Sequence, residues 1–202
     1  MKHLNISIFV GSPRKKGNSN NIAKYFQNSF KTAEKENEKK SQIKIYRLDE
    51  LEINPCKGCG YCDEKAECVI DDGMTSLYPV VDNSDLLVFV TPVYFASMPA
   101  QLKAFIDRFQ PYYAAKYLLK KPRIPMNSNK KVILYVISGY NKEYFFENIK
   151  QIIEIFCLNL NFELFDSFYY GGLDFAGEVL QRPKILKEIE NYSKELGKHP
   201  HL

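Results

Sequence analysis

The sequence predicts an α/β fold in which one parallel sheet is covered by helices on both faces. Short apolar runs alternate along the chain with longer segments whose apolar residues recur at three- and four-residue spacing. The apolar runs are bounded by turn residues, as is typical of strands that are buried on both faces. No long linker and no internal repeat breaks the alternation. We therefore expect residues 1–202 to form a single domain.

Five strands and five helices are expected. The stripe of Leu102, Phe105, Ile106 and Phe109 illustrates the helical spacing. The alternation fits a flavodoxin-like doubly wound fold with five parallel strands in the order 2-1-3-4-5, in which ligands bind at the carboxyl ends of the strands. The site is therefore expected in the loops after the first, third and fourth strands. Strands are predicted at residues 5–10, 43–48, 86–91, 131–138 and 162–169, and helices at residues 19–35, 74–83, 99–109, 142–158 and 178–196.

Composition and charge exclude several classes of protein. With 45% hydrophobic and 26% charged residues, the chain is neither disordered, collagen-like nor a coiled coil. The longest apolar runs, residues 86–90 and 132–137, are much shorter than the roughly 20 residues of a membrane span, so no membrane partner is expected. A net charge of +4, from 28 basic and 24 acidic residues, does not indicate nucleic-acid binding. The apolar run at residues 4–10 lacks the features of a secretory signal, which predicts a cytoplasmic protein.

A loop of small and polar residues, 11–20, joins the first predicted strand to the first helix. Its backbone N–H groups and hydroxyls can converge on an anion, and the helix N-terminus adds its dipole. The loop is not a Walker A motif, because five residues separate Gly11 from Gly17 and Asn18 occupies the position of the lysine. A cradle of this kind suits a monophosphate that is bound and not cleaved, such as that of FMN. The alternative is a solvated turn followed by an ordinary N-cap at Ser19.

A second loop, residues 91–99, follows the third predicted strand. Pro92 restricts its backbone, while Tyr94 and Phe95 offer flat apolar faces to a heterocyclic ring. The alternative is that Pro92 ends the strand, Pro99 begins a helix and the two aromatic rings belong to the core. Together with the first loop, however, a phosphate at one strand end and a ring at the next have the spacing of one mononucleotide.

These two loops, with the run from Met98 to Lys103 and the pair Asp107 and Arg108, resemble the NADPH-dependent FMN reductase family over nearly the whole chain. The resemblance implies an FMN-binding domain and a third binding segment after the fourth strand, with a weaker match in the glycine-rich turn after the fifth. It implies that the FMN phosphate is surrounded by Ser12, Arg14, Asn18, Ser19 and Asn20, that the isoalloxazine ring is lined by Pro92, Val93, Tyr94 and Phe95, and that the third segment contributes Ser138, Gly139 and Tyr140.

Four of the five cysteines lie within an insertion at residues 52–73. Cys56, Cys59, Cys62 and Cys68 are spaced as C-x2-C-x2-C-x5-C. Four soft thiolates suit zinc or an iron–sulfur cluster. Structural zinc sites normally use two separated pairs, whereas three cysteines at consecutive three-residue steps are typical of a ferredoxin-type run. The spacing therefore favours a 4Fe–4S cluster, and zinc or unligated thiols are the alternatives.

Within a chain that resembles the FMN reductases, this cysteine run is similar to that of the iron–sulfur flavoproteins of anaerobic microbes. That resemblance implies a 4Fe–4S cluster that passes electrons to FMN, often across a subunit interface. Related flavin reductases retain some of these cysteines without a cluster. The fifth cysteine, Cys157, lies in an apolar helical stripe and is expected in the core.

We therefore predict an FMN-dependent oxidoreductase of the iron–sulfur flavoprotein type. The flavin carries the chemistry, so no catalytic side chain is required, and the sequence offers no Ser–His–Asp or paired-carboxylate motif. We expect a homodimer or homotetramer, with small-molecule or protein electron donors and acceptors and NAD(P)H as a candidate donor. The alternatives are an NAD(P)H-dependent FMN, quinone or nitro-compound reductase without a cluster, and a non-catalytic zinc-stabilised binding module.

Overall fold

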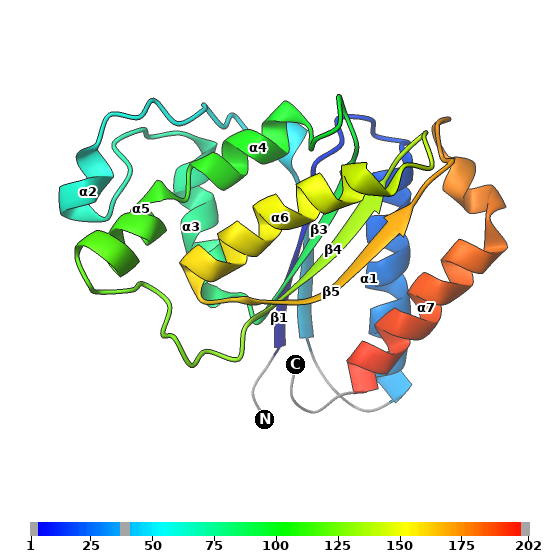
Figure 1. Cartoon of the computed structure of the whole chain (residues 1–202). Helices are drawn as coiled ribbons and strands as arrows, with labels where there is room; N and C mark the ends of the chain where they lie inside the picture. Colours follow the sequence, from blue (N-terminus) through cyan, green and yellow to red (C-terminus); the bar gives the residue numbers. More distant parts are fainter. Residues whose placement is uncertain (1–3, 37–40, 199–202) are drawn as a thin grey trace.

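The structure, a computed structural model, describes residues 4–36 and 41–198 of the 202-residue chain. Five parallel strands form one sheet in the order β2-β1-β3-β4-β5, which confirms the predicted topology (Figure 1). A register shift between Val132 and Ile133 is the one irregularity in the described strand pairing. The strands are β1 (Leu4–Val10), β2 (Ser41–Arg47), β3 (Leu86–Pro92), β4 (Lys131–Ile137) and β5 (Glu163–Tyr170).

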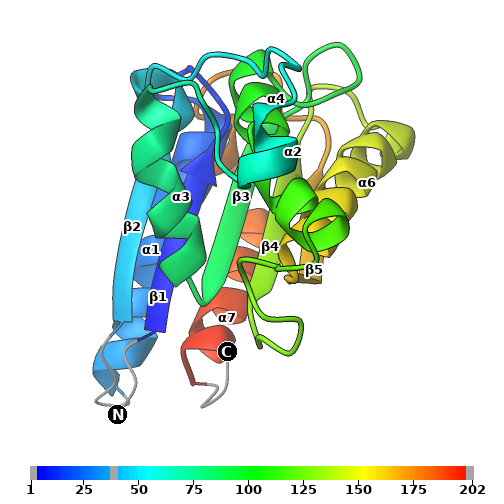
Figure 2. The same ribbon diagram turned by 90° about the vertical axis from the view of Figure 1, so that its left-hand side faces the viewer.

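Helices cover both faces of the sheet, as Figures 1 and 2 show. Two long helices, α1 (Asn18–Glu36) and α7 (Pro183–Lys198), pack side by side on one face. The other face carries α3 (Gly73–Asn83), α4 (Ala100–Asp107) and α6 (Glu143–Leu160). Shorter helical turns are η1 (Leu48–Glu50), α2 (Tyr61–Lys65), α5 (Gln110–Tyr113), the π-helical turn η2 (Ala114–Leu118) and η3 (Glu178–Gln181).

The side chains of the central strand β3 belong to two hydrophobic cores, one on each face of the sheet. Leu87 and Phe89 pack beneath α3, α4 and α6, while Val88 and Val90 pack beneath α1 and α7. All four side chains are fully buried. Side chains alternate between the faces of a strand, so a continuous apolar run fills both cores at once. Burial of each such side chain contributes about 1.5–3 kcal/mol.

The helix predicted at residues 178–196 is divided in two. Its first part is the 3-10 turn η3, and α7 begins only at Pro183. Proline lacks a backbone N–H and clashes with the preceding turn, so it is favoured in the first turn of a helix and disfavoured in the interior. It also pushes the residue before it away from helical geometry, and Arg182 has φ −113° and ψ 76°.

The helix predicted at residues 99–109 ends early, at Asp107. The chain continues through Arg108 into α5 and the π-helical turn η2. Cys157 is buried, as predicted. Over residues 4–36 and 41–198, no helix is long and apolar enough to cross a membrane.

Candidate active site

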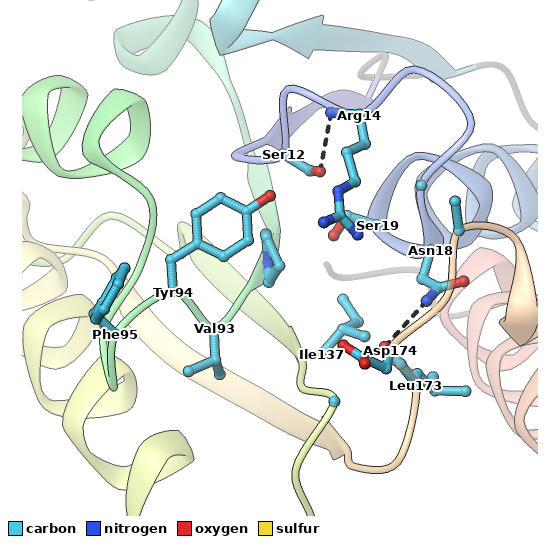
Figure 3. Close-up of a pocket in the computed structure, with 14 residues that line it drawn as sticks. Ser12, Arg14, Asn18, Ser19, Val93, Tyr94, Phe95, Ile137, Leu173 and Asp174 are labelled. Atoms are coloured by element: carbon cyan, nitrogen blue, oxygen red, sulfur yellow. Dashed lines mark hydrogen bonds between the residues drawn. The ribbon is translucent and has the colours of Figure 1, made fainter.

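A pocket of about 300 Å³ lies at the carboxyl ends of β1, β3 and β4 (Figure 3). The loops after these three strands, which the sequence predicts to form the site, all contribute to it. A fourth loop, after β5, closes one side. The lining residues are Ser12, Arg14, Gly17, Asn18, Ser19, Pro92, Val93, Tyr94, Phe95, Ile137, Gly139, Leu173, Asp174 and Ala176.

One end of the pocket is suited to an anion. The side chains of Ser12 and Ser19 are buried there, and the Arg14 guanidinium reaches down toward Ser19 (Figure 3). Helix α1 begins at Asn18 with no acidic residue in its first turn. The first N–H groups of a helix have no partner within the helix, and its dipole is positive at this end. Hydroxyls, a guanidinium and free amides therefore converge on one point.

A tight turn shapes this loop. The backbone N–H of Gly17 donates to the carbonyl of Arg14 at 2.9 Å, and the N–H of Arg14 donates to the Ser12 hydroxyl at 3.3 Å. A Cβ atom at position 17 would lie 2.9 Å from the Arg14 Cβ and 3.0 Å from its carbonyl oxygen. Glycine is therefore required for the turn that brings Arg14 over the helix N-terminus.

The side chain of Asn18 ties the start of α1 to the loop after β5. Its Nδ2 donates to the carbonyls of Leu173 at 3.3 Å and Phe175 at 3.0 Å, and its Oδ1 accepts the N–H of Val179 at 3.1 Å. Both ends of the amide are therefore engaged with backbone groups. Asn18 lines the pocket, but the polar atoms of its side chain bond to the backbone of the segment after β5, which forms one wall of the pocket.

Asn20 likewise bonds to the backbone of its own loop. Its Nδ2 donates to the carbonyl of Lys15 at 2.6 Å, and the residue does not line the pocket. Of the five residues predicted around an anion, the structure thus brings Ser12, Arg14 and Ser19 together with their polar groups available. The two asparagines fix the loops that carry them.

The other end of the pocket is formed by the loop after β3. Tyr94 points its ring into the pocket, whereas Phe95 lies at the rim with its side chain fully exposed (Figure 3). Mutual backbone hydrogen bonds of 2.8 and 3.0 Å between Tyr94 and Ser97 close a tight turn. Its central residues, Phe95 and Ala96, have φ values of 47° and 60°. This left-handed conformation is costly for residues other than glycine, and such strain gathers at functional sites.

The loop after β4 contributes a single residue. Gly139 lines the pocket, and a Cβ atom there would lie 2.6 Å from the Asp174 carboxylate. The buried Ser138 hydroxyl accepts the N–H of Tyr140 at 3.1 Å and so shapes the loop from behind. Tyr140 is exposed and lies outside the pocket lining.

The loop after β5 is the part of the pocket that the sequence did not predict in detail. It supplies Leu173, Asp174 and Ala176. The glycines at positions 171, 172 and 177 were a visible signal, but they do not indicate which side chains between them face a ligand. Asp174 adds a carboxylate to the pocket lining, which suits a ligand that also carries hydroxyl or N–H donors.

The four clustered cysteines lie in a long loop outside the sheet, between η1 and α3 (Figure 2). Cys56 and Cys59 are exposed, while Cys62 and Cys68 are partly buried. The short helix α2, which contains Cys62, packs against α5 and η2. The glycines at positions 58 and 60 have φ values of 62° and 73°. Glycine adopts this left-handed conformation without the strain that a Cβ atom would cause, so these two residues allow the backbone to turn here.

The four thiols are the right kind of donor for zinc or iron–sulfur but do not form a ready-made site. Within residues 4–36 and 41–198, no group of three or more His, Cys, Asp or Glu side chains is arranged to hold a metal ion. Burial raises the pKa of the Cys62 thiol, and the neighbouring Asp63, Cys56 and Cys59 raise it further. A cluster would therefore have to draw the sulfur atoms together and displace their protons.

Arg108 anchors this loop at both ends. Its Nη1 donates to the carbonyl of Asn54 at 2.8 Å, and its Nη2 donates to the carbonyl of Ile70 at 3.0 Å. Both nitrogens also bond to the carboxylate of Asp72, at 2.7 and 3.1 Å. The anchored residues lie just before Cys56 and just after Cys68. Arg108 therefore holds the two ends of the cysteine-containing loop close to each other.

A family model for NADPH-dependent FMN reductase matches residues 4–143. The chain belongs to this family. Among curated proteins, it is 38% identical over 104 residues to an iron-sulfur flavoprotein of Archaeoglobus fulgidus, covering 51% of this chain and 44% of that protein. It is 34% identical over 105 residues to an iron-sulfur flavoprotein of Methanosarcina thermophila, covering 52% of each. This FMN reductase family member thus spans about half the length of these curated relatives.

A solved structure of this fold supports the architecture. The FMN-dependent NADH-azoreductase of Bacillus anthracis str. Ames Ancestor, determined in complex with FMN, superposes with a TM-score of 0.71 at 15% identity. The match covers 98% of this chain and 100% of the other. At this identity the likeness shows the fold alone, and it agrees with the flavodoxin-like topology of the family.

Proposed function

We propose that this FMN reductase family member is a flavin-dependent oxidoreductase that binds FMN in the pocket after β1, β3 and β4. One observation carries the proposal: an anion-binding end and an aromatic platform face each other across a single pocket. The phosphate would bind at Ser12, Arg14, Ser19 and the start of α1. The isoalloxazine ring would bind against Pro92, Val93, Tyr94 and Phe95.

The chain's own residues would bind and orient the flavin. FMN, when bound, supplies the hydride and electron chemistry, so no acid–base side chain is needed. Asn18, Asn20 and Ser138 hold the surrounding loops, and Gly139 leaves room beside Asp174. Tyr140, in the same loop after β4 as Gly139, is exposed on the surface. NAD(P)H is the proposed electron donor, as the family name implies.

Comparison of FMN with riboflavin tests the phosphate end of the pocket. Arg14→Ala should weaken FMN binding by about 10- to 150-fold, because a charge-assisted hydrogen bond contributes about 1.5–3 kcal/mol. It should leave riboflavin binding unchanged. Lys16→Ala is the matched control, since it removes a charge from the same loop without touching the pocket. Flavin fluorescence quenching measures both affinities, and equal losses for the two flavins would contradict the assignment.

We further propose that Cys56, Cys59, Cys62 and Cys68 hold a 4Fe–4S cluster that exchanges electrons with FMN. Two observations support this: the four thiols occupy one loop anchored at both ends, and the curated relatives are named iron-sulfur flavoproteins. The second candidate is an NAD(P)H-dependent reductase without a cluster. The arrangement of donors favours that candidate, because within residues 4–36 and 41–198 no group of three or more His, Cys, Asp or Glu side chains is placed to hold a metal ion.

Anaerobic purification with iron, zinc and flavin counts separates the candidates. Iron with flavin supports the cluster, flavin alone supports the simple reductase, and zinc without flavin indicates a binding module. Cys59→Ser should abolish iron uptake and leave FMN affinity unchanged. Cys157→Ala, which removes the cysteine in the core, should keep its iron. Full iron content in Cys59→Ser would reject the ligand assignment.

A further inference from the structure

The anion end of the pocket depends on a loop whose tip is exposed. Residues 13–16, which include Arg14, are exposed, whereas the residues on either side of them are buried. Exposed loop tips are mobile unless their backbone is held in place. On the side of α1, the carbonyl of Lys15 accepts a hydrogen bond from Asn20 Nδ2 at 2.6 Å. The other side of the tip also needs a fixed contact if Arg14 is to keep one position.

The peptide unit that leads into Arg14 has both of its polar atoms bound. Its N–H, on Arg14, donates to the Ser12 hydroxyl at 3.3 Å. Its carbonyl, on Pro13, accepts a hydrogen bond from Arg47 Nη2 at 3.3 Å. A peptide unit is planar, so bonds to its two opposite sides fix the orientation of the whole unit. Arg47 therefore helps to set the direction in which the chain enters Arg14.

Arg47 is itself fixed to the sheet. It is the last residue of β2 and pairs with Val10, the last residue of β1, directly before the loop begins. Its Nη2 donates to Asp49 at 2.8 Å, and its Nε donates to Glu50 at 3.0 Å. The guanidinium is a planar fork, so these bonds hold it in one orientation. The side chain is only 12% exposed.

Stability alone does not account for this placement of Arg47. Its Nη1 is buried and has no hydrogen-bond partner within residues 4–36 and 41–198. A buried donor without a partner destabilises a folded protein, so it calls for an explanation. Direct attraction of a phosphate does not supply one, because Arg47 lies outside the pocket lining and its charge is paired with Asp49 and Glu50. What remains is its bond to the Pro13 carbonyl, beside Arg14.

We propose that Arg47 is a positioning residue for the anion end of the pocket: by holding the Pro13 carbonyl, it keeps Arg14 in place before a phosphate binds. The inference rests on the proposed function, because it concerns recognition of FMN at the same site. It adds to that site a residue that does not touch the ligand. A group that is already ordered loses less conformational entropy on binding. Arg47 should therefore strengthen binding of the flavin phosphate and not binding of the rest of the flavin.

Comparison of FMN with riboflavin in an Arg47 variant tests the proposal. Arg47→Met keeps most of the length of the side chain and removes its donors. It should weaken FMN binding about tenfold, within the range of coupling between neighbouring residues, and change riboflavin binding less than about twofold. Flavin fluorescence quenching measures both affinities, and thermal unfolding checks that the variant is folded. Equal losses for the two flavins would overturn the proposal.

Arg47→Lys separates the position of this side chain from its charge. A lysine keeps the charge but cannot bond to Pro13, Asp49 and Glu50 through one planar fork. It should therefore lose FMN affinity to a similar extent. Full FMN affinity in Arg47→Lys would show that the charge alone matters, and this would reject the positioning role. If Arg47→Met does not fold, Arg47→Lys decides the proposal.

The effect of Arg47 should also depend on Arg14. In the Arg14→Ala background, Arg47→Met should change FMN affinity less than about twofold, because no guanidinium is left to position. A merely structural role of Arg47 would weaken FMN binding by the same factor in both backgrounds. A further loss of about tenfold in the double variant would therefore contradict the proposal.

Arg182→Met is the matched control. Arg182 also bonds to a backbone carbonyl of a pocket loop, that of Gly172 at 3.2 Å, and to an acidic side chain, that of Glu178 at 2.6 Å. Because it holds the loop after β5, its replacement should change FMN and riboflavin binding equally. A selective loss of FMN binding in Arg182→Met would show that any disturbance of the pocket loops has this effect, and would remove the case for Arg47.

The same titrations separate this inference from the proposed function. If the wild type prefers FMN to riboflavin and the Arg47 variants keep that preference, the FMN site stands and the role of Arg47 is rejected. If the wild type binds neither flavin, the proposed function fails, and the role of Arg47 fails with it.

Discussion

The carboxylate of Asp72 and the guanidinium of Arg108 form a buried two-point ion pair, with Oδ2 at 2.7 Å from Nη1 and Oδ1 at 3.1 Å from Nη2. Their side chains are 4% and 0% exposed. The same carboxylate caps α3 by accepting the N–H of Met74 at 2.9 Å. One acidic group therefore joins the end of α4, the start of α3 and the return of the cysteine loop.

Removing the charge of Asp72 should destabilise the protein severely. Asp72→Asn keeps the shape but leaves a buried arginine without its counter-ion, a change that typically costs about 3–5 kcal/mol. Asp107→Asn is the matched control, because its pair with Lys103 is nearly half exposed and is expected to contribute about 0–1 kcal/mol. Denaturant unfolding measures both, and similar small losses would contradict the view that the Asp72 pair anchors the loop.

The same pair predicts how stability depends on acid. Burial alone would raise the pKa of Asp72, but Arg108 and the N–H groups of Asn54 and Met74 outweigh it and lower the pKa from 3.8 to about 2. A lowered pKa in the folded state means that the carboxylate stabilises the fold above pH 3.8, and this is lost as the pH falls toward 2. The loss amounts to about 2 kcal/mol. Unfolding curves measured between pH 5 and about 2 should show this loss of stability in the wild type and not in Asp72→Asn.

The local features of this fold could be predicted from sequence, whereas its long-range contacts could not. The continuous apolar run of β3 and the turn at Gly17 can be recognised from the residues of those short segments alone. Arg108 and Asp72, in contrast, lie 36 residues apart, and nothing in either short segment indicates their pairing. Asp174 reaches the pocket only because β5 follows β4 in the sheet. The asparagine at position 18 was predicted near a phosphate, and its hydrogen bonds instead run to backbone more than 150 residues away.

That long-range role of Asn18 leads to a further prediction. Asn18→Ala removes three hydrogen bonds and leaves the N–H of Val179 buried without a partner, so we expect a loss of about 2–3 kcal/mol. FMN affinity should fall as well, because the loop after β5 forms one wall of the pocket. Asn28→Ala, at an exposed position of the same helix, should change neither property. Thermal unfolding and flavin titration provide the readouts, and an unchanged melting temperature in Asn18→Ala would show that the link is dispensable.

The strained turn at Phe95 and Ala96 predicts a trade between stability and binding. Both residues have positive φ, so glycine at either position should relieve strain and stabilise the flavin-free protein by about 1 kcal/mol. The carbonyl of Ala96 accepts a hydrogen bond from Asn148 at 2.6 Å, which holds the turn in place in both variants. Ala96→Gly should leave flavin affinity unchanged. Phe95→Gly should gain the same stability but weaken flavin binding, because it also removes the aromatic ring at the rim. If the two variants bind FMN equally well, the exposed ring of Phe95 has no part in holding the flavin, and the strain of this turn needs another cause.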